Sequence, residues 1–173
     1  NMKKMLTDHQ ALSVMASNSL INMSRLAVIT FLPIYLSKTL EFSSSKLGLY
    51  ISLLYLLGIV SQPIMGIVSD KFGRKIILIP SFLIMGLTSL LIALTQNEIF
   101  LAIIIGILGV FFYPILNLNQ TAIMDVADKH IHASSMGITT LIMWPAVIIS
   151  PIIAGLLVDK FNIEIAFIYA GII

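Results

Sequence analysis

The sequence contains no cysteine and few charged residues. The absence of cysteine excludes a disulfide framework and a thiolate metal site. Only 10% of the 173 residues are Asp, Glu, Lys or Arg, and the formal net charge is +2. The basic residues are not gathered into one face, so we expect no nucleic-acid partner. A soluble domain of this length would need far more polar surface than these residues provide.

Long apolar segments make up most of the sequence. Hydrophobic residues make up 58% of the chain, and the mean hydropathy is +1.04. Spanning a bilayer takes about 20 apolar residues in a helix. Six segments meet or approach this length, and short polar connections separate them: residues 11–36, 46–69, 75–95, 99–124, 134–158, and a last one from 163 onward. The sequence therefore predicts an all-α protein that crosses a lipid bilayer six times.

One short pattern occurs twice. "GIVSDKF" (Gly66–Phe72) at the end of the second segment returns as "GLLVDKF" (Gly155–Phe161) at the end of the fifth. An offset of three helices, an odd number, places the two copies on opposite sides of the membrane. A 3+3 inverted repeat has this arrangement. Chance similarity between two helix ends is the alternative interpretation.

The basic residues near the helix ends predict an orientation. With the N-terminus in the cytoplasm, the inner side holds six of them and the outer side three, which follows the positive-inside rule. The inner set is Lys3, Lys4, Lys71, Arg74, Lys75 and Lys129, and the outer set is Lys38, Lys46 and Lys160. We therefore expect "DKFGRK" to be a cytoplasmic loop of a multi-pass protein in the cell membrane.

The same loop resembles the signature of a known family. Gly66-x-x-x-Asp70-Lys71-x-Gly73-Arg74-Lys75 fills every position of G-x-x-x-D-[RK]-x-G-[RK]-[RK], the cytoplasmic loop pattern of the major facilitator superfamily. The pattern also lies where that family has it, between the second and third helices. The resemblance implies half of a twelve-helix transporter, whose other six-helix half, in the same longer chain, faces it across a central substrate path.

The position of this half in a longer chain is a further expectation. Loop signatures of this strength are usual in the N-terminal half, whereas a start that resembles an interdomain loop favours the C-terminal half. "AVIISPIIAG" (Ala146–Gly155) looks like a degraded antiporter pattern, G-x-x-x-G-P-x-x-G-G. We expect residues 1–173 to form one domain that is truncated in its last helix, and we favour the C-terminal half.

The loop signature provides a candidate gate. Gly73 would allow a tight turn and Gly66 a close helix approach. Arg74 and Lys75 begin a helix, where the helix dipole disfavours positive charge, so an acid such as Asp70 or Asp125 should compensate. The resemblance implies a network of Asp70, Arg74 and Asp125 that locks and releases the helices. A simple positive-inside anchor, with Lys71 as one of its charges, is the alternative.

Two polar stripes indicate a candidate substrate path. Asn18, Asn22 and Arg25 are spaced i, i+4, i+7 on the first helix, and Tyr113, Asn117 and Gln120 repeat this spacing on the fourth. A charge at mid-membrane should face protein or water, and Arg25 would attract an anionic group or a carboxylate of the other half. Trp144 could stack on a substrate. The alternative is that the amides join helices by hydrogen bonds and that Trp144 only packs.

One cluster could indicate an enzyme. "DVADKHIH" brings Asp125, Asp128, His130 and His132 together in a connecting loop, and such groups can bind a metal. No further His or acid lies near it in the sequence, so we expect a solvated loop, with no metal, no cofactor and no enzymatic activity.

The predicted function is secondary active transport of a small solute by alternating access, as an antiporter or symporter. Acidic residues lie only near helix ends and in connections, so a titrating acid would come from the other half, or else the protein is a uniporter. A non-transporting polytopic protein, receptor-like or an assembly subunit, is the alternative on the same fold.

Overall fold

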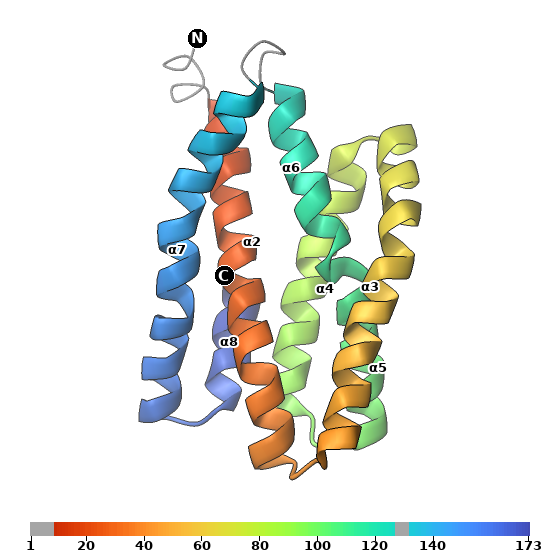
Figure 1. Ribbon diagram of the computed structural model, residues 1–173, viewed down its shortest axis with the longest axis vertical. Helices are drawn as coiled ribbons and strands as arrows, with labels where there is room; N and C mark the ends of the chain where they lie inside the picture. The colour runs from red at the N-terminus through yellow and green to blue at the C-terminus, as the bar shows by residue number, and fades with distance from the viewer. Residues whose placement is uncertain (1–8, 127–131) are drawn as a thin grey trace.

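The computed structural model describes residues 9–126 and 132–173, and every regular element in these ranges is a helix (Figure 1). The elements are α2 (His9–Ile34), a π-helical segment η1 (Tyr35–Thr39), α3 (Ser44–Phe72), α4 (Arg74–Leu94), α5 (Glu98–Phe112), α6 (Pro114–Val126), α7 (His132–Lys160) and α8 (Glu164–Ile172). The all-α prediction is confirmed.

Five helical stretches of the described chain are long and apolar enough to cross a membrane. They are Leu12–Thr39, Ser44–Phe72, Arg74–Leu94, Glu98–Ala122 and Thr139–Lys160. The nine residues of α8 extend for only about 14 Å at 1.5 Å per residue, less than the ~30 Å of a hydrocarbon core. Five of the six predicted segments thus correspond to helices long enough to span a membrane. The predicted limits agree with the observed helix ends to within a few residues in most cases.

Local sequence explains where several helices begin. The Ser43 hydroxyl accepts from the backbone N–H of Lys46 at 3.4 Å, and the Asn97 side chain accepts from Phe100 at 3.1 Å. Such N-caps satisfy donors that the first helical turn leaves free. Between α3 and α4 the chain turns at Gly73, whose φ of 97° is open to glycine and strained for other residues.

The connections between helices lie at two opposite ends of the bundle. The α3–α4 turn, the end of α6 and the start of α7 lie at the same end as the start of α2, at the top of Figure 1. The α2–α3, α4–α5 and α7–α8 connections lie at the other end. The two copies of the G-x-x-x-D-K-F pattern thus end helices on opposite sides, as predicted.

The fourth predicted helix differs from expectation because it is broken. The sequence predicts one helix over 99–124, but α5 ends at Phe112 and α6 begins at Pro114, with Tyr113 in a turn between them. Proline has no N–H and its ring crowds the preceding turn, so the regular bond to the carbonyl of Val110 cannot form. The hydroxyl of Ser61 on α3 donates to that carbonyl instead, at 2.6 Å.

Equivalent contacts recur in the two halves of the bundle. The α3–α5 and α2–α7 pairs have the most extensive contacts, followed by α4–α8. Ser61 of α3 donates to Val110 O of α5, and Ser150 of α7 donates to Met23 O of α2 at 2.7 Å. Ser150 follows Ser61 by 89 residues, the same offset that separates Gly155 from Gly66.

The third pair of helices, α4 and α8, approaches closely at two glycines. A Cβ on Gly86 of α4 would lie 3.0 Å from the carbonyl oxygen of Gly171 in α8, and one on Gly171 would lie 2.8 Å from that of Gly86. The two helices therefore pack closely at these glycines. The paired serine contacts and the opposite ends of the two G-x-x-x-D-K-F copies indicate a 3+3 inverted repeat.

Candidate functional site

Arg25 is buried in the middle of the first membrane span. Its side chain is 8% exposed, and its guanidinium carbon lies 4.3 Å from the centre of the Phe112 ring and 5.4 Å from that of Tyr113. These are cation–π distances. Nε of Arg25 is buried without a hydrogen-bond partner among the described residues. The cation is therefore held by aromatic faces at the break between α5 and α6.

Symmetry explains why Arg25 meets Phe112. Val110 follows Met23 by 87 residues, and these two residues carry the equivalent serine-bonded carbonyls. Phe112 follows Arg25 by the same 87 residues. Equivalent positions of α2 and α5 therefore touch where the two repeats cross, and one repeat supplies a cation where the other supplies an aromatic ring.

The amides of the first span form a small network one to two turns from Arg25. Asn18 is buried, and its Oδ1 accepts from Asn22 at 3.1 Å and from Asn119 at 3.5 Å. Asn18 also donates to the sulfur of Met143 on α7 at 3.5 Å. The network joins α2, α6 and α7, so these amides connect helices as well as bordering the Arg25 site.

The second predicted stripe divides between two environments. Tyr113 packs beside Arg25 and Tyr55, whose ring centre is 5.5 Å from its own. Asn117 and Gln120 are exposed on α6. Trp144 is 53% exposed on α7. Arg25 and Tyr113 are thus brought together as the two stripes predict, while the other members of the second stripe extend the polar surface outward.

Four residues around Arg25 and Tyr113 were not predicted from the sequence. Phe112 and Asn119 contact α2 directly, Tyr55 packs on Tyr113, and Gln62 is an exposed amide two turns beyond Tyr55 on α3. The repeat offset could have found Phe112 as the partner position of Arg25. Gln62 was visible as an amide inside an apolar span.

The loop signature forms part of the predicted network. Arg74 makes an ion pair with Asp70 at 2.5 Å and donates to the hydroxyl of Ser69 at 3.3 Å. Asp70, four residues before Arg74, therefore compensates positive charge at the start of α4. The side chain of Asp125 lies outside the described part of the structure, so its membership stays a prediction.

Gly66 does not have the packing role that its place in the signature predicts. No atom lies within 4 Å of a Cβ built on this residue, so the expected close helix approach is wrong for contacts within the described chain. Close approach occurs instead at Gly58 and Gly109, where α3 and α5 cross.

The possible metal cluster cannot be placed in full. Asp128 and His130 lie outside the described residues, and the side chains of Asp125 and His132 are likewise not described. Among the residues that the structure does describe, no group of three His, Cys, Asp or Glu side chains could hold a metal ion.

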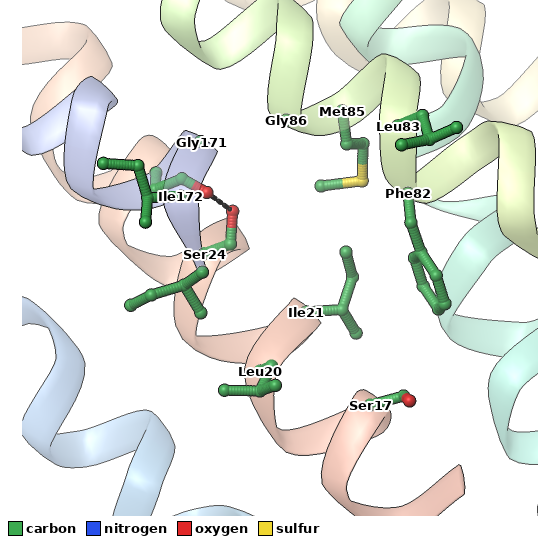
Figure 2. A pocket seen from close by; sticks show the side chains of 12 residues that line it. Ser17, Leu20, Ile21, Ser24, Phe82, Leu83, Met85, Gly86, Gly171 and Ile172 are labelled. Carbon is green, nitrogen blue, oxygen red and sulfur yellow. Dashed lines mark hydrogen bonds between the residues drawn. The ribbon is translucent and has the colours of Figure 1, made fainter. Parts of the chain in front are cut away.

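A separate groove lies between α2, α4 and α8 (Figure 2). It has a volume of about 230 Å³, and Ile21, Phe82 and Met85 are among the side chains that line it. Ser24 donates across one edge to the carbonyl of Ala170 at 2.5 Å, which ties α2 to α8. The groove has no charged lining residue, which distinguishes it from the Arg25 site.

Comparison with known proteins agrees with the fold and the loop signature. Residues 14–173 match the Major Facilitator Superfamily. The chain belongs to the major facilitator superfamily. Among its relatives in that family are proteins named "Multidrug resistance protein MdtG". The one from Salmonella choleraesuis (strain SC-B67) is 30% identical over 154 residues, and the one from Enterobacter lignolyticus (strain SCF1) is 29% identical over 147 residues.

Coverage differs between this superfamily member and those relatives. The two alignments include 84% and 81% of this chain but only 37% and 34% of the relatives. The chain thus spans little more than a third of their length. Family membership and the apolar helices make it an integral, multi-pass membrane protein.

Proposed function

We propose that the full-length protein transports a small organic solute across the membrane by alternating access, with this chain as one of two facing six-helix halves. The observation that carries the proposal is Arg25, a buried cation in the middle of a membrane span with aromatic and amide groups around it. A charge in that position is unfavourable in lipid and is found where a path or a water-filled cavity needs it. Membership of a transporter family supports the same conclusion.

The proposed path runs along the face formed by α2, α3, α6 and α7. These four helices lie at the front in Figure 1, with α5 and α8 behind them. On α3, Tyr55 and Gln62 follow helical spacing, and α6 adds Asn117 and Gln120; all four are exposed. Polar side chains exposed within spanning helices need water or protein as neighbours, which the facing half and the path between the halves would provide.

The solute class follows from the relatives. They are named for multidrug resistance, so we propose that this protein also moves drug-like organic molecules, driven by a solute or proton gradient. Trp144 would offer such molecules an exposed aromatic face.

The proposed orientation places the α3–α4 turn in the cytoplasm of a cell whose plasma membrane holds the protein. In an otherwise cysteine-free full-length protein, a membrane-impermeant thiol reagent should label Ser45→Cys in intact cells. Phe72→Cys should react only after lysis. The reverse pattern would invert the orientation.

Transport itself is tested with purified full-length protein in liposomes. We expect carboxyfluorescein, a dye that carries carboxylate groups, to move faster than in protein-free liposomes, and an imposed proton gradient should accelerate the movement. If neither this dye nor any member of a wider panel of antibacterial drugs crosses faster than in empty liposomes, the proposal is wrong.

A further inference from the structure

Among the described residues, the cation of Arg25 has no carboxylate beside it as a counter-ion. The acidic residues in the described ranges lie at helix ends or in connections, away from the middle of any span: Glu41, Asp70, Glu98, Asp125, Asp159 and Glu164. The ion pairs of the described residues use Asp70 with Arg74 and Glu98 with Lys46. Within the part of the chain that the structure describes, no acidic residue is therefore placed to neutralise Arg25.

The surroundings of Arg25 orient the guanidinium but leave its charge available. Phe112 and Tyr113 contact it through ring faces, which attract a cation without accepting its N–H groups in hydrogen bonds. Nε has no hydrogen-bond partner among the residues that the structure describes. A planar fork of N–H donors held on an aromatic platform is the geometry that binds a carboxylate or phosphonate with two parallel hydrogen bonds.

Neighbouring groups suit an organic acid better than a bare ion. Asn22 is half-buried within the amide network, and the rings of Tyr55 and Tyr113 offer polarisable faces with hydroxyl groups at their edges. An aromatic or aliphatic body could pack on these rings while its acid group meets Arg25. Within the described residues, no acidic side chain near this region would repel such a ligand.

We propose that Arg25 is the receptor for the anionic group of the transported molecule, so that the site selects organic acids over their neutral analogues. The inference rests on the proposed transport function, and it assigns the counter-ion to the solute rather than to a carboxylate elsewhere in the protein.

The test compares an acid with its uncharged isostere on purified full-length protein. We expect benzoate and phenylphosphonate to raise the melting temperature at millimolar concentration, and benzamide to raise it much less. Arg25→Gln should increase the half-maximal benzoate concentration by about tenfold or more and remove the difference between benzoate and benzamide. Arg25→Lys keeps the charge but loses the planar fork of N–H donors, so its preference for benzoate over benzamide should be smaller than that of the unmodified protein. If the glutamine variant does not fold, the lysine variant alone provides the test.

Lys38→Gln is the matched control, because it also removes one positive charge, from an exposed position at a helix end. It should behave like the unmodified protein. Equal shifts with benzoate and benzamide, or an acid preference that survives in both Arg25 variants, would overturn the inference. The inference would also be overturned if benzoate had no effect and Arg25→Gln melted at a lower temperature than the unmodified protein. The counter-ion of Arg25 would then belong to the protein.

The outcomes also separate this inference from the transport proposal. Dye transport without any acid preference contradicts the role of Arg25 and leaves transport intact. Acid binding that depends on Arg25, without transport of any compound, contradicts the transport proposal alone.

Discussion

Gly58 and Gly109 determine how closely α3 and α5 approach each other. A Cβ on Gly109 would lie 2.5 Å from the carbonyl oxygen of Leu54 and 3.0 Å from its Cα. A Cβ on Gly58 would lie 2.6 Å from Cδ2 of Tyr113. In membranes, small residues let helix backbones pack closely and gain van der Waals contact. These contacts place Phe112 and Tyr113 against Arg25.

Replacing Gly109 should therefore destabilise the bundle. For Gly109→Ala we expect a loss of about 1–3 kcal/mol, because the methyl group meets backbone that cannot move aside as a side chain can. Thermal unfolding of the purified full-length protein measures the change.

Gly48→Ala provides the control, since a Cβ there meets nothing within 4 Å on the same helix α3. It should leave stability unchanged or raise it slightly. Similar melting temperatures for the two variants would show that the close crossing is not needed.

The broken fourth span is the element on which the site depends. Pro114 ends the regular hydrogen bonding of α5, and Ser61 supplies the missing donor to Val110. The break places Tyr113 in a turn, with its ring beside both Arg25 and Tyr55. In the equivalent contact, Met23 lies inside the unbroken helix α2, so its carbonyl has the helical N–H of Ala27 as well as Ser150.

This difference predicts unequal effects for two equivalent serines. Ser61→Ala should cost about 1 kcal/mol, because it leaves the partly buried carbonyl of Val110 without this donor, whereas Ser150→Ala should cost less. Thermal unfolding of both variants, side by side, measures the difference.

Adding Pro114→Ala restores a backbone N–H and should reduce the cost of Ser61→Ala. The opposite ranking of the serines, or an unchanged cost in the Pro114→Ala background, would refute this account of the break.

At the scale of the whole molecule, the inverted repeat places equivalent helix ends on opposite sides with different chemistry. The end of α3 carries Asp70 paired with Arg74, whereas the end of α7 carries Asp159 with neither glycine nor arginine after it. Only the first end has the charges of the proposed gate. A Cβ on Gly66 would meet no atom of the described chain within 4 Å, so this part of α3 has no close helix contact there.

The gate predicts a separation of transport from stability. Asp70 is largely exposed, so its ion pair should contribute less than about 1 kcal/mol, and Asp70→Asn should insert and unfold almost normally. Its transport rate in liposomes should nevertheless fall several-fold. Gly66→Leu should likewise insert and unfold almost normally and transport several-fold more slowly.

Asp159→Asn at the equivalent end of α7 serves as the control and should transport normally. Unimpaired transport by both Asp70→Asn and Gly66→Leu would leave the loop as a positive-inside anchor.

The sequence alone determined the helical class, the approximate limits of the spans and the family signature around Gly73. These properties depend on local composition: a run of about 20 apolar residues must become a helix in a bilayer, since its backbone has no other hydrogen-bond partners. The repeated G-x-x-x-D-K-F also predicted the inverted arrangement, because an odd number of spans reverses direction.

Only the tertiary structure decided which side chains meet. Helical spacing placed Asn117 and Gln120 on a stripe with Tyr113, but helix rotation and the break at Tyr113 bring Asn119 to α2 and leave the other two amides exposed. Close packing occurs at Gly58 and Gly109 rather than Gly66. Such contacts depend on crossing angles and on pairs of residues far apart in sequence, which periodicity within one helix does not contain.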